Sequence, residues 1–167
     1  GLMRAYYMGA SSSDHSGIFP PRVKPGDTIL VHAGVYESDR FHYLNGLPRP
    51  GYNAYANGVD GTYYLTASGT PDKPIVIKAA GDGEVVFDGA GNGNLFNLLR
   101  ANYNYFEGIT VRNTTVAFLL GWKDIGGSSG FTLKNSRIYD VARVVQDEWS
   151  GSRDDYIADN VMIGRHD

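Results

Sequence analysis

One short phrase occurs three times in this sequence, and the repetition limits the folds that the chain can adopt. The copies are YNYFEGITVRN (103–113), SGFTLKNSRIYD (129–140) and RDDYIADNVMIG (153–164). Aligned on Phe106, Leu133 and Ala158, they follow one another at spacings of 27 and 25 residues. Each copy has short apolar and polar alternation but no 3.6-residue period, which indicates β-strands rather than a helix. Self-similarity at this period predicts a solenoid of stacked β coils.

A coil of about 25 residues, folded into three short strands, can stack on the next coil at the usual strand spacing of roughly 4.8 Å. Its inward side chains then form a continuous apolar column. The same alignment matches residues 116–119 with 141–144 and places Asn135 and Asn160 in the same turn. We therefore expect these two side-chain amides to hydrogen-bond along the stack as a short ladder.

The upstream half fits the same architecture with more irregularity. Segment 25–38 predicts a turn and two strands, and further strands are expected at 75–78 and 85–88. Between them lies 39–61, which is rich in Pro, Gly, Asn and Tyr and is too long for an ordinary connection. We interpret 39–61 as a long loop insertion in a single β-helix domain that spans residues 1–167.

Composition argues against several classes of function. The net charge of −3, with both signs scattered, argues against a nucleic-acid partner. The absence of cysteine excludes disulfides and thiolate metal sites. No apolar run approaches the roughly 20 residues that span a bilayer, so we expect no membrane span. The first residues show neither the basic region nor the apolar region of a secretory signal.

Two runs, GDTILVHAGVY and GTYYLTASGTPDKPIVIKAAGDGEVVFDG, resemble the N-terminal coils of secreted right-handed parallel β-helix proteins. This is the group around the pectate, alginate and chondroitin lyases, and the resemblance covers residues 23–167. It implies an all-β, right-handed parallel β-helix that is extracellular or at the cell surface and has an acidic polysaccharide as its partner. Because members of this group are usually considerably longer, it also implies an N-terminal portion, truncated at its C-terminal end, of a longer protein.

The resemblance further implies a chemistry. Uronate lyases of this fold remove the proton α to a sugar carboxylate with a Lys or Arg, while Ca²⁺ held by side-chain oxygens neutralises the developing charge. The acidic run DEWSGSRDD supplies four candidate calcium ligands, which are Asp147, Glu148, Asp154 and Asp155. The candidate bases, which are expected to share one face, are Arg143, Lys134 and Arg153.

Aromatic side chains are candidates for stacking on sugar rings. They are Trp149 in the acidic run and Tyr43, Tyr52 and Tyr55 in the insertion. Both groups also have ordinary structural explanations, since acidic loops beside an Arg are commonly solvated turns and loop aromatics can pin a loop onto the domain. The family's motifs are mostly missing: there is no E-x-E pair, and Ala158 stands where a third acid is expected after Asp154 and Asp155.

Two functions therefore stay open. The first is an extracellular protein that binds or degrades a polysaccharide, in its most specific form a calcium-dependent uronate lyase acting by β-elimination. The alternative is a structural β-solenoid, such as a filament subunit or adhesin stalk without enzymatic activity. A β-helix has two ends with unpaired backbone, and the sequence shows no amphipathic capping helix before Pro25 and no cap after Asn160. On the alternative, copies associate through these open ends.

Overall fold

Two parallel β-sheets make up most of the described chain. The computed structural model describes residues 1–7, 21–37, 62–123 and 126–165. The five strands of the first sheet are, in spatial order, β1 (Thr28–Val31), β4 (Ile75–Ala79), β6 (Asn104–Glu107), β9 (Thr132–Lys134) and β11 (Tyr156–Ala158). The main strands of the second are, in spatial order, β12 (Val161–Gly164), β10 (Arg137–Asp147), β7 (Thr110–Trp122), β5 (Val85–Asn97) and β2 (Gly34–Tyr36). Two short strands complete it, since β3 (Tyr63–Tyr64) pairs with β5 and β8 (Gly126–Gly127) pairs with β7.

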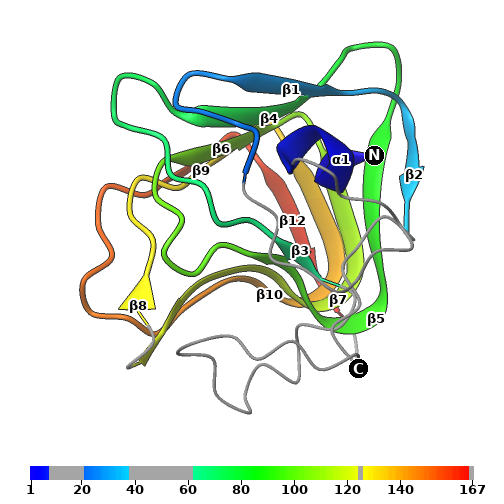
Figure 1. The fold of residues 1–167 in the computed structure, drawn as a ribbon. Helices are drawn as coiled ribbons and strands as arrows, with labels where there is room; N and C mark the ends of the chain where they lie inside the picture. Colours follow the sequence, from blue (N-terminus) through cyan, green and yellow to red (C-terminus); the bar gives the residue numbers. More distant parts are fainter. Residues whose placement is uncertain (8–20, 38–61, 124–125, 166–167) are drawn as a thin grey trace, which may run out of the picture.

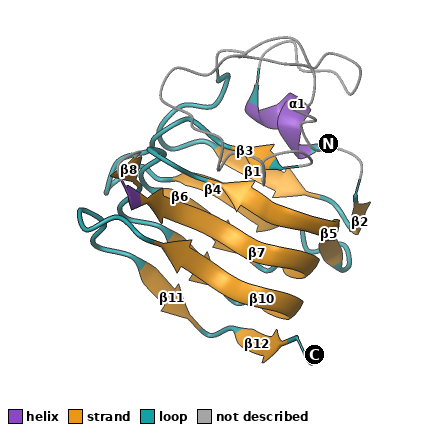
Figure 2. Ribbon diagram, turned by 90° about the horizontal axis from the view of Figure 1, so that it is seen from below, coloured by secondary structure: helices purple, strands orange, loops and turns teal. Residues whose placement is uncertain are grey.

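The chain alternates between the two sheets and adds one strand to each in turn. We call the successive strand pairs layers: layer 1 is β1 and β2, layer 2 is β4 and β5, layer 3 is β6 and β7, layer 4 is β9 and β10, and layer 5 is β11 and β12. Neighbouring layers pair in parallel in both sheets. Figure 1 shows the strands of successive layers lying one behind another, and Figure 2 shows the stack from the side. The prediction of an all-β chain with parallel strands is confirmed.

A residue in the left-handed conformation lies at the corner between the two strands of a layer. Gly108, Asn135 and Asp159 occupy this corner in layers 3, 4 and 5, with φ of +70°, +49° and +57°. Glycine adopts this conformation freely, and asparagine and aspartate tolerate it better than most other residues. The chain can therefore pass from the first sheet to the second at each corner without a long loop.

This corner corrects the expected alignment of the third copy of the phrase. Phe106 pairs with Leu133, as predicted, but Leu133 pairs with Ile157 rather than with Ala158. The third copy is therefore shifted by one residue from the alignment made on the sequence. The shift matters because neighbouring residues of a strand point to opposite faces.

The predicted amide ladder is also wrong. Asn135 lies at the corner and donates to Glu107 Oε1 of layer 3 at 3.0 Å. Asn160 lies one position beyond its own corner residue and accepts from the backbone N–H of Ser136 at 2.8 Å. Both side chains do connect neighbouring layers, but each bonds to the layer before its own and not to the other.

The longer strands bend, and the bend corrects a second alignment. Asn113 in β7 and Asp140 in β10 have φ of +55° and +53° within their strands. After the bend Val116 pairs with Arg143, and not with Val141 as the match of 116–119 to 141–144 predicted. Each of these strands thus has two limbs that face different directions.

A column of aromatic rings forms the centre of the core. Phe96 of layer 2 and Phe118 of layer 3 stack with ring centroids 5.0 Å apart and planes 9° from parallel. Phe131, directly before β9, continues the column 5.1 Å from Phe118. All three side chains are at most 1% exposed. Such ring pairs add stability beyond the area that they bury.

The end of the stack at layer 1 is covered by a short helix, α1 (Leu2–Tyr6) (Figure 2). Leu2 and Met3 are 2% and 4% exposed and belong to the main core. Tyr6 is fully buried, and its hydroxyl donates to the backbone oxygen of Ala67 at 3.2 Å. The expectation that no capping helix precedes Pro25 is therefore wrong.

The end at layer 5 differs. Ile157 and Met162 continue the inward columns formed by Leu133 and Ile138, which are fully buried in layer 4. Ile157 is nevertheless 44% exposed and Met162 43% exposed. No described residue covers this end as α1 covers the other.

Candidate functional site

The second limb of β7 and the residues directly after β5 carry an apolar group that is separate from the main core. Its members, which we call the apolar strip, are Leu99, Val116, Leu119 and Trp122. Leu99, Val116 and Leu119 are only 5%, 3% and 6% exposed, so they form a second, smaller buried cluster, whereas Ala117, Phe118 and Leu120 of β7 belong to the main core. The half-buried indole of Trp122 ends the strip, with the ammonium of Lys123 5.9 Å from the ring centroid.

A polar row lies beside the apolar strip in the next layer. We call Arg143, Gln146 and Glu148 the polar strip, because they form one hydrogen-bonded chain. Arg143 Nη1 donates to Gln146 Oε1 at 3.3 Å, and Gln146 Nε2 donates to Glu148 Oε1 at 2.7 Å. Register places Arg143 beside Val116 and Gln146 beside Leu119. The exposed polar strip therefore lies directly beside a buried apolar cluster, of which the half-buried Trp122 is the most accessible member.

Trp149 lies near the end of the same limb, and glycines make room for its ring. A Cβ atom at Gly127 would lie 2.7 Å from Trp149 Cε3, and one at Gly151 would lie 2.6 Å from Cη2. These separations are too short for any side chain larger than hydrogen. The backbone N–H of Trp149 donates to Asp147 Oδ1 at 3.0 Å. The half-buried indole of Trp149 therefore packs against the backbone at Gly127 and Gly151. The sequence alone did not explain why these two positions are glycine.

The four acidic residues expected to hold calcium are placed around this loop without converging. Within the described residues, no group of three or more His, Cys, Asp or Glu side chains is arranged to hold a metal ion. Glu148 is bonded to Gln146, and Asp155 Oδ1 accepts from the backbone N–H of Phe131 at 2.8 Å. Asp154 lies 3.8 Å from Arg153. These contacts do not fit calcium, which needs several oxygens directed at one point.

The carboxyl group of Asp155 has a raised pKa. Burial raises the pKa of Asp155, and the charges of Asp147 and Asp154 raise it further against the opposing hydrogen bond from Phe131. Repulsion between these carboxylates shows that the three charges act on one another. Burial is thus the main cause of the raised pKa, and the two neighbouring carboxylates add to it.

The three candidate bases do not share a face. Arg143 is exposed on the second limb of β10, whereas Lys134 ends β9 in the other sheet. Lys134 pairs in register with Glu107. The pKa of Glu107 is lowered chiefly by the hydrogen bond from Asn135 and that from Tyr105, with Lys134 adding to the effect. Arg153 is exposed in the loop before β11. These positions correct the expectation that the three candidate bases share one face.

The remaining predicted residues cannot be placed. Tyr43, Tyr52 and Tyr55 belong to the insertion 39–61, which lies outside the described residues. Conversely, Trp122 and Gln146 take part in the surface and were not expected from the sequence. Neither Trp122 nor Gln146 could be expected from the sequence pattern, because the bend in β7 and β10 changes which residues of those strands face outward.

The chain was compared with models of protein families, with curated proteins and with solved structures. Nothing matched in any of the three. The candidate site therefore depends on its own geometry.

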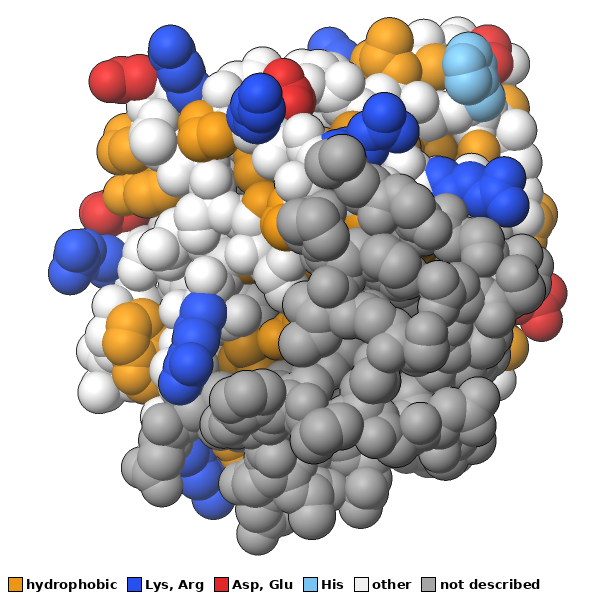
Figure 3. All heavy atoms as spheres, viewed as in Figure 1, with side chains coloured by type: hydrophobic (Ala, Val, Ile, Leu, Met, Phe, Trp, Pro, Cys, Tyr) orange, Lys and Arg blue, Asp and Glu red, His pale blue; other side chains and the backbone are white. Residues whose placement is uncertain are grey.

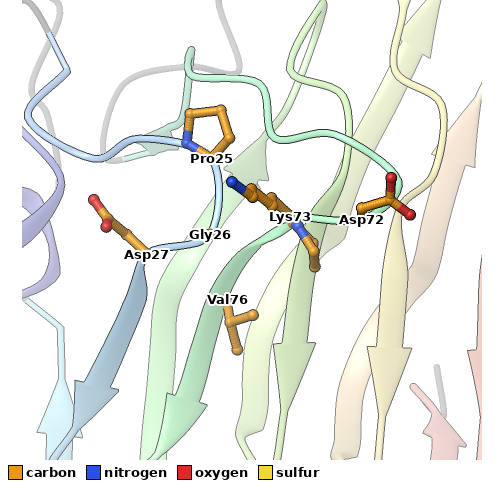
Figure 4. A pocket seen from close by; sticks show the side chains of 7 residues that line it. Pro25, Gly26, Asp27, Asp72, Lys73 and Val76 are labelled. Carbon is orange, nitrogen blue, oxygen red and sulfur yellow. The ribbon is translucent and has the colours of Figure 1, made fainter.

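Two other surface features were considered as sites. A depression between β1 and the segment before β4 is lined by Pro25, Gly26, Asp27, Asp72, Lys73, Pro74 and Val76. In Figure 4 the ammonium of Lys73 points toward Pro25, while the carboxylates of Asp27 and Asp72 point away to either side. Among the described side chains on the face in Figure 3, acidic and basic groups are interspersed. Neither feature brings polar groups together, and no helix in the described part of the chain is long and apolar enough to cross a membrane.

Proposed function

We propose that the chain is a right-handed parallel β-helix that binds an acidic polysaccharide outside the cell or at its surface. The five layers, their parallel register and the left-handed corners support the β-helix. The right-handed path follows the general rule for parallel crossovers. The polysaccharide binds along the second limbs of β7 and β10.

The observation that carries this function is the exposed Arg143 of the polar strip, on a limb that ends near the half-buried indoles of Trp122 and Trp149. The half-buried indoles offer an apolar surface to sugar rings, and the exposed Arg143 offers a cation to a carboxylate. Arg143 is exposed, so its guanidinium can exchange the bond to Gln146 for one to a ligand. A guanidinium binds a carboxylate through two parallel hydrogen bonds, which favours acidic over neutral sugars.

Calcium and β-elimination stay predictions and are not needed for binding. The described carboxylates do not form a calcium cage, so no catalytic step is assigned to the ion. If the sugar is also cleaved, Arg143 is the candidate base on this surface for the proton α to the carboxylate. An assay for the absorbance of unsaturated products, with and without added Ca²⁺, distinguishes a binding protein from a lyase.

Binding is tested by titrating the chain calorimetrically with polygalacturonate, with a neutral glucan for comparison. We expect Arg143→Ala to weaken polygalacturonate binding about ten-fold or more, since hydrogen bonds to a charged group contribute about 1.5–3 kcal/mol. Arg137→Ala is the matched control, because Arg137 is an exposed arginine on the first limb of the same strand. Equal affinity of the two variants, or equal binding of the neutral glucan, would contradict the proposal.

A further inference from the structure

The amide of Gln146 is the central link of the polar strip, and its two partners leave it a single orientation. A guanidinium only donates hydrogen bonds, and an ionised carboxylate only accepts them. The carbonyl oxygen of Gln146 must therefore face Arg143, and the NH₂ group must face Glu148. The contacts agree, since Arg143 Nη1 lies 3.3 Å from Gln146 Oε1 and Gln146 Nε2 lies 2.7 Å from Glu148 Oε1. A flipped amide would set donor against donor and acceptor against acceptor.

The two hydrogen bonds of this amide differ in length. The bond to Glu148 has the short length typical of a charged acceptor, whereas the bond from Arg143 is longer than most. Gln146 is half-buried, while Arg143 and Glu148 are exposed. A ligand carboxylate would therefore draw Arg143 away before it disturbed the amide. Glu148 then still holds the NH₂ group, and the carbonyl oxygen of Gln146 stays in place as a fixed acceptor.

A fixed acceptor beside a guanidinium defines the kind of sugar that fits. The guanidinium of Arg143 donates to a carboxylate, and the carbonyl oxygen of Gln146 accepts from a hydroxyl. Uronate polymers carry both groups close together along the chain. An O-acetylated hydroxyl has lost the proton that it would donate, so it would leave the half-buried carbonyl oxygen opposite an acetyl group and without a hydrogen bond.

We propose that Gln146 is a specificity-determining residue of the polysaccharide site and that Glu148 positions it. The site then selects uronate polymers that have free hydroxyls near their carboxylates, and it disfavours the same polymers after O-acetylation. This inference rests on the proposed function, because it requires that Arg143 binds the carboxylate. It adds a second requirement, since a carboxylate alone satisfies Arg143 but not Gln146.

The first test compares polygalacturonate with polygalacturonate whose ring hydroxyls are O-acetylated, each titrated calorimetrically into the unmodified chain. Both polymers carry the same charge per sugar unit, so a difference in affinity does not come from the carboxylates. We expect acetylation to weaken binding about two- to ten-fold, which is the effect of one neutral hydrogen bond. Equal binding of the two polymers would overturn the inference and leave the proposed function intact. If neither polymer binds, the proposed function fails and the inference fails with it.

The second test separates the amide from the size of the acetyl groups. Gln146→Met keeps an unbranched side chain of similar length but removes the amide. We expect this variant to bind the two polymers equally, with an affinity near that of wild type for the acetylated polymer. Arg137→Ala, on the first limb of β10, is the control and should retain the wild-type ratio of affinities. If acetylation weakens binding by the same factor in Gln146→Met as in wild type, the acetyl groups act through their size and the inference is wrong.

The third test addresses the positioning by Glu148. Glu148→Gln presents a second amide, which both donates and accepts, so that Gln146 is no longer held in one orientation. The loss of a negative charge affects the binding of both polymers alike and cancels in the ratio of their affinities. We expect this ratio to fall from the wild-type value toward one, with an unchanged circular dichroism spectrum because Glu148 is exposed. An unchanged ratio would show that Glu148 does not position Gln146.

Discussion

The two ends of the stack finish the same kind of core in different ways. At layer 1, α1 buries Tyr6 fully and leaves Leu2 and Met3 almost without exposed surface. At layer 5, inward Ile157 and Met162 are each more than two-fifths exposed. The burial of an inward residue therefore depends on the next element of the stack. Leu133 and Ile138, at the same positions one layer earlier, are fully buried.

The largest expected effect is at the covered end. Tyr6→Ala removes a fully buried ring and leaves a cavity between α1 and the first layers, so the free energy of unfolding should fall by about 3–5 kcal/mol. The measurement is urea denaturation followed by circular dichroism. Tyr156→Ala is the control at the open end, since Tyr156 is 55% exposed, and it should cost only about 1 kcal/mol. Similar losses for both variants would show that α1 does not act as a cap.

The next effect compares one column in two layers. Leu133→Ala should cost about 2–5 kcal/mol, because Leu133 is fully buried between Phe106 and Ile157. Ile157→Ala should lower the free energy of unfolding by only about 1 kcal/mol, since nearly half of the Ile157 side chain is already in water. Denaturation at low protein concentration measures both. If Ile157→Ala lowers the free energy of unfolding as much as Leu133→Ala does, Ile157 is covered in solution and the two ends of the stack do not differ in this way.

These two columns also show how much the sequence could predict. The repeated phrase was sufficient for parallel stacking and for the pair Phe106 and Leu133, because apolar alternation and a fixed period are local signals. The third copy was misaligned by one residue because the alignment treated Asp159 as equivalent to Lys134. Asp159 in fact occupies the left-handed corner, as Asn135 does, and conformation at a corner is not visible in a hydrophobic pattern.

Helix α1 and the candidate site show what the sequence could not predict. Five residues are too few to display a 3.6-residue period, so α1 could not be separated from irregular chain. Arg143 and Trp149 were named from their chemistry. Their neighbours Trp122 and Val116 depend on the bend at Asn113, which changes the side to which later residues of β7 point.

A smaller effect at the covered end isolates one hydroxyl. Tyr6→Phe keeps the ring but removes the oxygen that donates to Ala67 O and accepts from the Ala67 backbone N–H at 3.0 Å. Leaving a buried backbone group without its partner should lower the free energy of unfolding by about 1–3 kcal/mol, less than Tyr6→Ala. Urea denaturation of the two Tyr6 variants side by side gives the comparison. If Tyr6→Phe is as stable as wild type, the helix is held by apolar packing alone.

The smallest effect concerns two aspartates, one inside the stack and one at its open end, whose pKa values shift in opposite directions. Burial opposes ionisation of Asp88, but hydrogen bonds from the Ala90 backbone, from Arg112 and from Asn113 outweigh it and lower the pKa. Asp88 should therefore stabilise the fold above the unfolded pKa of about 3.9, with this contribution lost as pH falls through the lower folded value. The pKa of Asp155 is raised by burial and by Asp147 and Asp154, so the folded chain binds that proton more tightly, and the stability contribution of Asp155 should increase as pH falls.

Unfolding free energies of Asp88→Asn and Asp155→Asn between pH 3 and 7 separate these two cases. Asp88→Asn should be less stable than wild type at pH 7, with the difference shrinking below about pH 4. Asp155→Asn keeps an oxygen for the Phe131 backbone N–H and removes a charge that burial disfavours, so it should match or exceed wild type at pH 7. A loss of stability in Asp155→Asn at pH 7 that disappears in acid would show that Asp155 is held by a favourable partner, as Asp88 is by Arg112. The interior and the open end of the stack would then hold these two carboxylates in the same way.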